Sequence, residues 1–314
     1  PCTPPPTPTS AKPPPKRLAR SFFDTCGIWE NHEMSMSSGA VLREAEPRLP
    51  PERNLDLIDE IATRIRPDDP GLEEWLSRYY RQHRQRLASD LCIVEQHLEP
   101  ESRILEYGAI PLLLTGALRE LGYNLSAVDI SPERFAGPIA ALGLDITRCD
   151  VEIEPVPFAA ETFDAVLFNE LFEHLRIDPI FTLAEARRVL KPNGSLLLST
   201  PNLRSLRGIR NLLLHNQGHA ASAGVYEQYE KLETLGHMGH VREYTTREVS
   251  DFLARVGFRV DKLIFRGGHG RGAVGLVERL MPSLRPFFTL RATKTEPQTS
   301  IPGAEPPSPR SEDR

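Results

Sequence analysis

The stretch RILEYGAIPLLL, residues 103–114, decides the fold of this chain. It opens with an apolar run of strand length that ends at Glu106 and Gly108, as in the turn of a dinucleotide-binding unit. The later glycines of such a turn are missing, because residues 109–111 read AIP. A pyrophosphate needs those glycines for its close approach to the backbone, whereas a nucleoside without phosphates does not. The loop therefore predicts a nucleoside ligand and not a dinucleotide.

Outward from this stretch, strand-like and helix-like segments alternate along the chain. Such alternation, with strands that are apolar throughout, is typical of a parallel sheet whose two faces are covered by helices. We therefore predict an α/β protein with a Rossmann-like, seven-stranded, mostly parallel sheet, helices on both faces and an N-terminal helical cap. The strands are expected at residues 103–108, 124–131, 145–152, 163–170, 195–202, 258–267 and 286–295.

Composition divides the chain into a folded region and two tails. Residues 1–50 are rich in proline and residues 295–314 lack apolar periodicity, so both are expected to be disordered. Residues 51–100 show helical periodicity and are expected to form the cap. Residues 101–294 form the expected α/β domain, and the long connection 203–244 within it is expected to be a lid over the ligand edge.

Charge and composition limit the classes of partner. The 314 residues carry a net charge of −5, which gives no general attraction to nucleic acid or to anionic membranes. The four cysteines have no zinc-type spacing, and no apolar run is long enough to span a bilayer. We expect a cytoplasmic protein without a nucleic-acid or membrane partner, and the sequence does not specify an oligomeric state.

Acidic residues at the strand ends narrow the choice of ligand. In parallel sheets of this kind the ligand lies beyond the carboxyl ends of the strands. Asp129 lies 21 residues after Gly108, close to the interval at which an acid binds a ribose. S-adenosylmethionine has a ribose, an adenine and a cationic amine but no pyrophosphate, and Glu106 could accept a hydrogen bond from that amine. The strand ends therefore favour S-adenosylmethionine over NAD.

Six segments occur in the order of motifs in a known enzyme family: ILEYG, LSAVDIS, RCDVE, PFAAETFDAVLFNELFEHL, RRVLKPNGSLLLSTPN and HVREYTTREVSDFLARVGF. Across about residues 75–294 the chain resembles the class I S-adenosylmethionine-dependent methyltransferases of the small-molecule type, and its glycine loop departs from their pattern. The resemblance implies that residues 101–294 bind S-adenosylmethionine and that the enzyme moves a methyl group to an oxygen or nitrogen of a small molecule or glycan. It implies that the cofactor is bound by Glu106, Gly108, Asp129, Asp150, Val151, Asn169 and Glu170.

Several of these residues have an ordinary alternative role. Asp129 could cap the next helix, Glu106 could be a buried acid balanced by an arginine, and Asp150 could be a loop acid. His174 and His240 are the candidate catalytic bases, because an alcohol acceptor needs a base and imidazole titrates near neutral pH. His174 could instead pack beneath a helix.

The candidates for binding the acceptor come from the cap and from the lid. Arginines in the lid segment 203–217 could recognise an anionic or sugar-like acceptor, or they could form a solvated helix face. His237 and His240 have no fixed third ligand nearby in the sequence, so we predict no metal site. The candidate acceptor-binding residues are Tyr79, Tyr80, Arg207, His237, Arg242 and Tyr244.

Two other classes of function stay open. A non-catalytic methyltransferase-like binding protein would account for the altered glycine loop. An NAD(P)-dependent oxidoreductase is disfavoured by the same loop and by the absence of a Tyr-x-x-x-Lys pair after the fourth strand. Measured binding of the cofactor separates the first of these from an enzyme.

Overall fold

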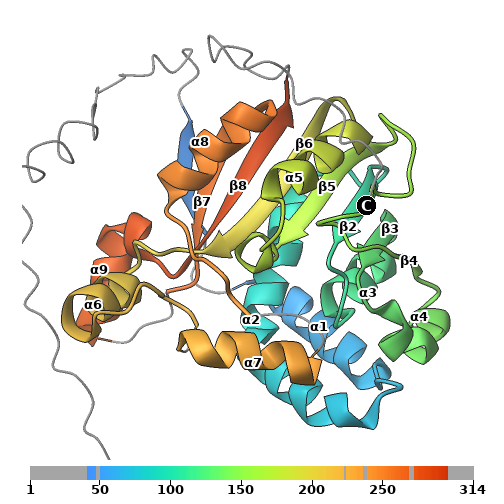
Figure 1. The fold of residues 1–314 in the computed structure, drawn as a ribbon, viewed down its shortest axis with the longest axis horizontal. Helices are drawn as coiled ribbons and strands as arrows, with labels where there is room; N and C mark the ends of the chain where they lie inside the picture. Colours follow the sequence, from blue (N-terminus) through green and yellow to red (C-terminus); the bar gives the residue numbers. More distant parts are fainter. Residues whose placement is uncertain (1–40, 47–49, 223, 236–238, 269–271, 296–314) are drawn as a thin grey trace, which may run out of the picture. The chain divides into compact units, whose positions relative to one another are not determined.

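The computed structural model describes residues 41–46, 50–222, 224–235, 239–268 and 272–295, which contain a sheet covered by helices on both faces (Figure 1). The strands are β1 (Leu42–Ala45), β2 (Arg103–Tyr107), β3 (Asn124–Asp129), β4 (Asp145–Arg148), β5 (Phe163–Asn169), β6 (Leu190–Pro201), β7 (Phe258–Arg266) and β8 (Phe287–Lys294). The helices are α1 (Glu52–Arg64), α2 (Glu73–His97), α3 (Leu113–Glu120), α4 (Ala136–Leu142), α5 (Pro179–Val189), α6 (Leu206–His215), α7 (Val225–Leu235), α8 (Thr246–Val256) and α9 (Gly272–Leu280), and the 3-10 turn η3 (Phe172–His174) follows β5. None of the helices within these ranges combines the length and the apolarity that crossing a membrane requires.

The strands lie in the order β1-β7-β8-β6-β5-β2-β3-β4. Strand β8 runs antiparallel to β6 and β7, and the other neighbouring pairs are parallel. The predicted α/β class and the mostly parallel, Rossmann-like sheet are confirmed. Helices α1 and α2 occupy the stretch 51–100 in which the helical cap was expected.

The predicted number of strands, seven, is wrong because β1 makes the sheet eight-stranded. Strand β1 pairs in parallel with β7, from Leu42 beside Lys262 to Ala45 beside Phe265, and it lies inside the stretch 1–50 that was expected to be a tail. All four of its side chains are exposed. The strand is therefore held by its backbone pairing, and it carries none of the apolar alternation through which a sequence reveals a strand.

Side chains along a strand alternate between the two faces of the sheet, so every second residue faces the same side. This alternation shows which face Glu106 and Asp129 are on. Ile104 belongs to the core beneath α1, α2 and α3, whereas Leu105 belongs to the core beneath α5 and α8. Glu106 has the parity of Ile104 and therefore points toward the cap. Asp129 shares its parity with Ala127, which lies in the same cap-side core. Two acids from neighbouring strands thus face the same side of the sheet.

Candidate active site

The strand order reverses between β2 and β5, because β3 and β4 continue on one side of β2 while β5 and β6 lie on the other. Ligands of open α/β sheets bind beyond the carboxyl ends of the strands at such a point. Asp129 and Asn169 end β3 and β5 there, and Glu106 lies one residue before the end of β2. The Asn169 Oδ1 atom accepts a hydrogen bond of 3.2 Å from the Ser199 hydroxyl. The fold therefore brings three of the predicted cofactor-binding residues to one edge.

Glu106 is a buried acid, with 3% of its surface exposed. Its Oε2 atom has no hydrogen-bond partner among the described residues. Burial raises the pKa of Glu106 to about 8, a hydrogen bond from Thr115 opposes the shift, and the negative charge of Asp129 adds to it. A carboxylate in this position would gain stability from a cationic group of a ligand.

The altered glycine loop folds back onto Asp129. The Asp129 carboxylate accepts a hydrogen bond of 2.9 Å from the Ile110 N–H and one of 3.0 Å from the Ser131 N–H. Gly108 has a φ of 76°, and a side chain there would come within 3.4 Å of the Leu171 side chain. Asp129 thus holds the loop and the next turn, and because a carboxylate has about four acceptor positions it can still accept from hydroxyl groups.

The segment after β4 forms a defined turn. The Asp150 Oδ1 atom accepts from the Glu152 N–H at 3.1 Å, and the Asp150 N–H donates to Glu154 at 2.8 Å. The Val151 carbonyl accepts from the Thr182 hydroxyl at 3.0 Å. The predicted cofactor-binding residues Asp150 and Val151 are therefore held in a fixed backbone conformation.

Glu170 belongs to a buried ionic cluster. Directly after β5, with a φ of 49°, it lies 3.1 Å from Arg266 Nη2 and 3.9 Å from Arg86 Nη1. Arg266 also forms an ion pair with Asp90, and the side chains of both are 2% exposed. The cluster joins α2 to the carboxyl ends of β5 and β7, so the Glu170 carboxylate is engaged with the cap.

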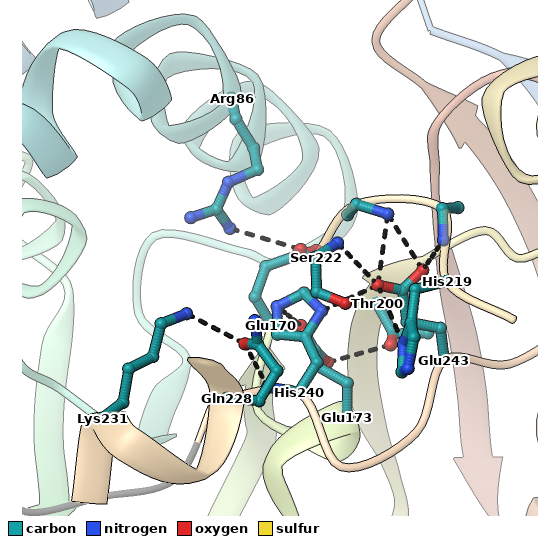
Figure 2. A network of polar contacts seen from close by, with 12 residues as sticks. Arg86, Glu170, Glu173, Thr200, His219, Ser222, Gln228, Lys231, His240 and Glu243 are labelled. Carbon is teal, nitrogen blue, oxygen red and sulfur yellow. Dashed lines mark hydrogen bonds and ion pairs between the residues drawn. The ribbon is translucent and has the colours of Figure 1, made fainter. Parts of the chain in front are cut away.

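Next to this cluster, Glu173, His240 and Glu243 point toward one another (Figure 2). The Glu173 Oε2 atom accepts from the Thr200 hydroxyl at 2.9 Å, and its Oε1 atom lies 3.9 Å from His240 Nε2. The other ring nitrogen of His240, Nδ1, lies 3.0 Å from Glu243 Oε1. The ring of His174 lies 5.0 Å from that of His240, in an edge-to-face arrangement. Both predicted catalytic histidines are therefore side by side.

The surroundings set the charge of these groups. Burial alone would lower the pKa of His240, but the hydrogen bond to Glu243 and the charge of Glu173 outweigh burial and raise it. Burial would raise the pKa of Glu243, whereas its bond to His240 and hydrogen bonds from three backbone N–H groups lower it to about 2. Those three N–H groups belong to Ala220, Ala221 and Ser222.

Among the predicted acceptor-binding residues, Tyr244 and Arg242 lie beside η3, and Tyr79 lies beside the ionic cluster. The ring of Tyr244 lies 4.7 Å from Phe172 in η3, and the guanidinium of Arg242 stands 5.1 Å above the Tyr244 ring. The hydroxyl of Tyr79 accepts a hydrogen bond of 2.8 Å from Arg86, which also contacts Glu170.

The remaining acceptor candidates lie elsewhere. Tyr80 donates a hydrogen bond of 2.6 Å to Asp59, which joins α2 to α1 within the cap. Arg207 is exposed on α6. His237 lies outside the described residues.

Sequence reasoning did not include Glu173 and Glu243 among the candidates. Glu173 directly precedes His174, and Glu243 lies between the candidates Arg242 and Tyr244. A signal for Glu173 was present, because a Glu-His pair directly after a strand end places two potential ligand groups in one turn. Glu243 gave no such signal, because its partners other than His240 are backbone groups about twenty residues away in the sequence.

Comparison with known proteins assigns the chain to a family. Residues 72–263 match the family model described as a methyltransferase domain. The chain belongs to this methyltransferase family. The assignment to the class I S-adenosylmethionine-dependent methyltransferases, with S-adenosylmethionine as the cofactor, is confirmed.

Two curated relatives of this methyltransferase are ubiquinone biosynthesis O-methyltransferases. That of Xanthomonas campestris pv. campestris is 34% identical over 108 residues, which cover 33% of this chain and 44% of the relative. That of Cereibacter sphaeroides is 34% identical over 105 residues, which cover 32% of this chain and 41% of the relative. The methyltransferase thus spans less than half the length of these relatives.

Solved structures of other methyltransferases are more distant. A Thermotoga maritima S-adenosylmethionine-dependent methyltransferase, described as a possible histamine N-methyltransferase, is 22% identical with a TM-score of 0.48 and covers 71% of this chain and 95% of its own. The 1,6-didemethyltoxoflavin-N1-methyltransferase of Burkholderia thailandensis, solved with S-adenosylhomocysteine, is 17% identical with a TM-score of 0.42 and covers 72% and 88%. Neither likeness bears on the substrate of this methyltransferase.

Proposed function

We propose that this protein is an active methyltransferase that moves a methyl group from S-adenosylmethionine to an oxygen or nitrogen of a small molecule or glycan. The observation that carries the proposal is the pair of acids at the switch point. Glu106 and Asp129 lie on adjacent strands, share one face, and are both less than one-tenth exposed. The Glu106 Oε2 atom has no hydrogen-bond partner among the described residues and is thus suited to a cationic ligand group.

The residues at this edge fit the parts of the cofactor. Glu106 would accept a hydrogen bond from the amine of the methionine portion, and Asp129 would accept from the ribose hydroxyls. Asp150 and the Val151 backbone, held by the turn after β4, would contact the adenine. Gly108 keeps the loop close to the strand end, where its missing side chain leaves room beside Leu171. No phosphate-binding glycines are required for any of these contacts.

The protein mainly aligns the acceptor with the methyl group and provides a base for the acceptor proton. Bound S-adenosylmethionine would supply a methyl group on a positively charged sulfur. The acceptor atom bonds to the methyl carbon while the carbon–sulfur bond breaks with both electrons staying on sulfur, and the acceptor proton passes to a base. His174 and His240 are the candidate bases, because they lie together at the edge. Alignment of acceptor and methyl group supplies on the order of several kcal/mol.

An oxygen acceptor is the better supported of the two. The curated relatives are named as O-methyltransferases of ubiquinone biosynthesis, and an alcohol needs the base that the paired histidines could provide. The charge of −5 gives no general attraction to nucleic acid and thus favours a small acceptor.

Calorimetric titration with S-adenosylhomocysteine tests the proposal. The native chain should bind it in the micromolar range, and Asp129→Ala should weaken binding by roughly tenfold to a hundredfold, because hydrogen bonds to a charged group contribute about 1.5–3 kcal/mol. Asp129→Asn, which keeps one acceptor oxygen for the loop, separates ligand contact from loop folding. Asp251→Ala, on the exposed side of α8, is the matched control and should bind normally.

Cofactor binding and methyl transfer are then measured separately. Release of S-adenosylhomocysteine from S-adenosylmethionine should be followed over a panel of phenols, sugars and small amines. Absence of heat and of a thermal shift with the native chain would contradict the proposal. Cofactor binding without turnover on any acceptor class would instead support a non-catalytic binding protein.

A further inference from the structure

The group formed by Glu173, His174 and His240 has the composition of a metal site. Each side chain offers one ligand atom, and these atoms lie within 4.8 Å of one another. Two imidazoles and one carboxylate are the ligand set of catalytic zinc and of non-haem iron sites, which keep open positions for substrate or water. The sequence-based expectation of no metal weighed His237 and His240 and did not include Glu173.

A buried carboxylate atom points into this group without a hydrogen-bond partner. The Glu173 side chain is fully buried, and its Oε1 atom accepts no hydrogen bond from the described residues. Its contact there is His240 Nε2 at 3.9 Å, which is too long for a hydrogen bond. Its other oxygen is already used by Thr200. One carboxylate oxygen is therefore held in place while the other faces the two imidazoles.

The histidine is oriented in the way that metal-binding histidines are. Such residues usually give their second ring nitrogen to a carboxylate or carbonyl, which fixes the ring and its tautomer. His240 Nδ1 lies 3.0 Å from Glu243 Oε1, which leaves Nε2 directed toward Glu173. Glu243 is itself anchored by hydrogen bonds from the backbone of residues 220–222. The ring is thus positioned by a chain of contacts that does not involve Glu173.

The backbone also fixes His240 beside η3. The Glu173 carbonyl accepts from the Val241 N–H at 2.8 Å, and the His240 N–H donates to Gln228 at 3.1 Å. The loop that carries His240 is therefore tied to the turn that carries Glu173 and His174. Metal–ligand distances of about 2.0–2.2 Å would place the three ligand atoms roughly 3–3.5 Å apart, so a closure of about an ångström completes the site.

We propose that Glu173, His174 and His240 bind one divalent transition-metal ion at the carboxyl edge of the sheet, with Glu243 as the residue that positions His240. Two imidazole ligands favour Zn²⁺, Fe²⁺ or Co²⁺ over Mg²⁺ or Ca²⁺, which prefer oxygen ligands. The role of the ion rests on the proposed function. It binds the acceptor hydroxyl oxygen and favours loss of the hydroxyl proton to solvent, before that oxygen bonds to the methyl carbon. This replaces the role of His174 and His240 as bases: in the metal-bound protein both are ligands of the ion, and the acceptor proton passes to solvent.

The first test uses the full chain, stripped of metal with a chelator and titrated with Co²⁺ and Zn²⁺. Co²⁺ should bind one per chain with visible absorption bands, Zn²⁺ should displace it, and Mg²⁺ at the same concentration should not. His240→Ala and Glu173→Gln should abolish the bands, whereas Glu243→Gln should weaken binding about tenfold to a hundredfold, as expected for a residue behind the ligand. His215→Ala, at an exposed position of α6, should behave as the native chain.

Two results would overturn the site: no Co²⁺ bands with the native chain, or unchanged bands in His240→Ala. If His240→Ala does not fold, His174→Gln, which is close in shape to histidine, takes its place and should likewise lose the bands. Titration of the same samples with S-adenosylhomocysteine keeps the two proposals apart. Ligand binding without Co²⁺ bands rejects only the metal site, and Co²⁺ bands without ligand binding reject only the proposed function.

Discussion

At the scale of single residues, the two acids of the switch point differ in their surroundings. Asp129 is surrounded by backbone donors, with both oxygens accepting hydrogen bonds from the loop and the next turn. Glu106 has instead the negative charges of Asp129 and Asp90 as neighbours, and burial is the largest influence on its pKa. Asp129 therefore has donors in place for both oxygens, while Glu106 is the group whose charge depends on pH and on ligand.

We expect Glu106 to make the protein less stable as pH rises. Its pKa is about 8 in the folded chain against an ordinary value of 4.5, so between these values the folded state holds a proton that the unfolded chain has lost. The free energy of unfolding should then fall by up to about 1.4 kcal/mol per pH unit from this group. Urea unfolding of Glu106→Gln should show a smaller decrease between about pH 5 and about pH 8.

A control for this prediction is Glu133→Gln, which removes an acid in the turn after β3. Its unfolding free energy should follow the native pH dependence. A Glu106→Gln profile parallel to that of the native chain would show that Glu106 is ionised throughout this range in the folded state.

At the scale of elements, the ionic cluster joins the cap to the sheet. Arg266 from the end of β7 contacts Asp90 of α2 and Glu170 after β5, and Arg86 of α2 lies beside both acids. Burial raises the pKa of Asp90 to about 6 although both guanidiniums lower it. The cluster holds together only while its positive groups are present, because each acid is removed from water.

Arg266→Met should therefore destabilise the fold by about 3–5 kcal/mol, since it leaves buried carboxylates without their partner. Arg53→Ala is the matched control, because Arg53 also bridges to α2, at Glu95, but its side chain is 71% exposed. That change should cost less than about 1 kcal/mol. Urea unfolding measures both, and equal small losses would show that the buried cluster contributes no more than a surface pair.

At the scale of the whole molecule, the sequence predicted the sheet and the residues at its edge. Strand β5 carries the apolar run AVLF at residues 165–168. Because ligands of such sheets lie beyond the strand ends, the sequence also predicted that Glu106 and Asp129 lie at one edge. The pairing of Glu170 with Arg266 could not be predicted, because it joins side chains 96 residues apart. No local sequence pattern predicts such a contact.

The helices of the lid were also only partly predictable from the sequence. A helix was expected at the start of this connection, where α6 lies, whereas no helix was predicted over α7 in the same connection. Helix α9, after β7, was not expected either. The position of His240 beside Glu173 depends on backbone bonds between the lid and η3, such as that from Val241 to the Glu173 carbonyl. Such a contact depends on the whole fold and cannot be predicted from the local sequence.

We expect strand β1 to protect the molecule against self-association. It is short and exposed, it carries Arg43 and Glu44, and Glu44 pairs with Lys262 at 2.9 Å. Short charged edge strands discourage the addition of a strand from another molecule. A chain that lacks residues 1–49 would present the unpaired backbone edge of β7 and should form oligomers as its concentration rises, whereas a chain that lacks residues 1–40 keeps β1 and should not. Light scattering over a concentration series distinguishes the two, and the useful N-terminal boundary for soluble protein therefore lies before Leu42.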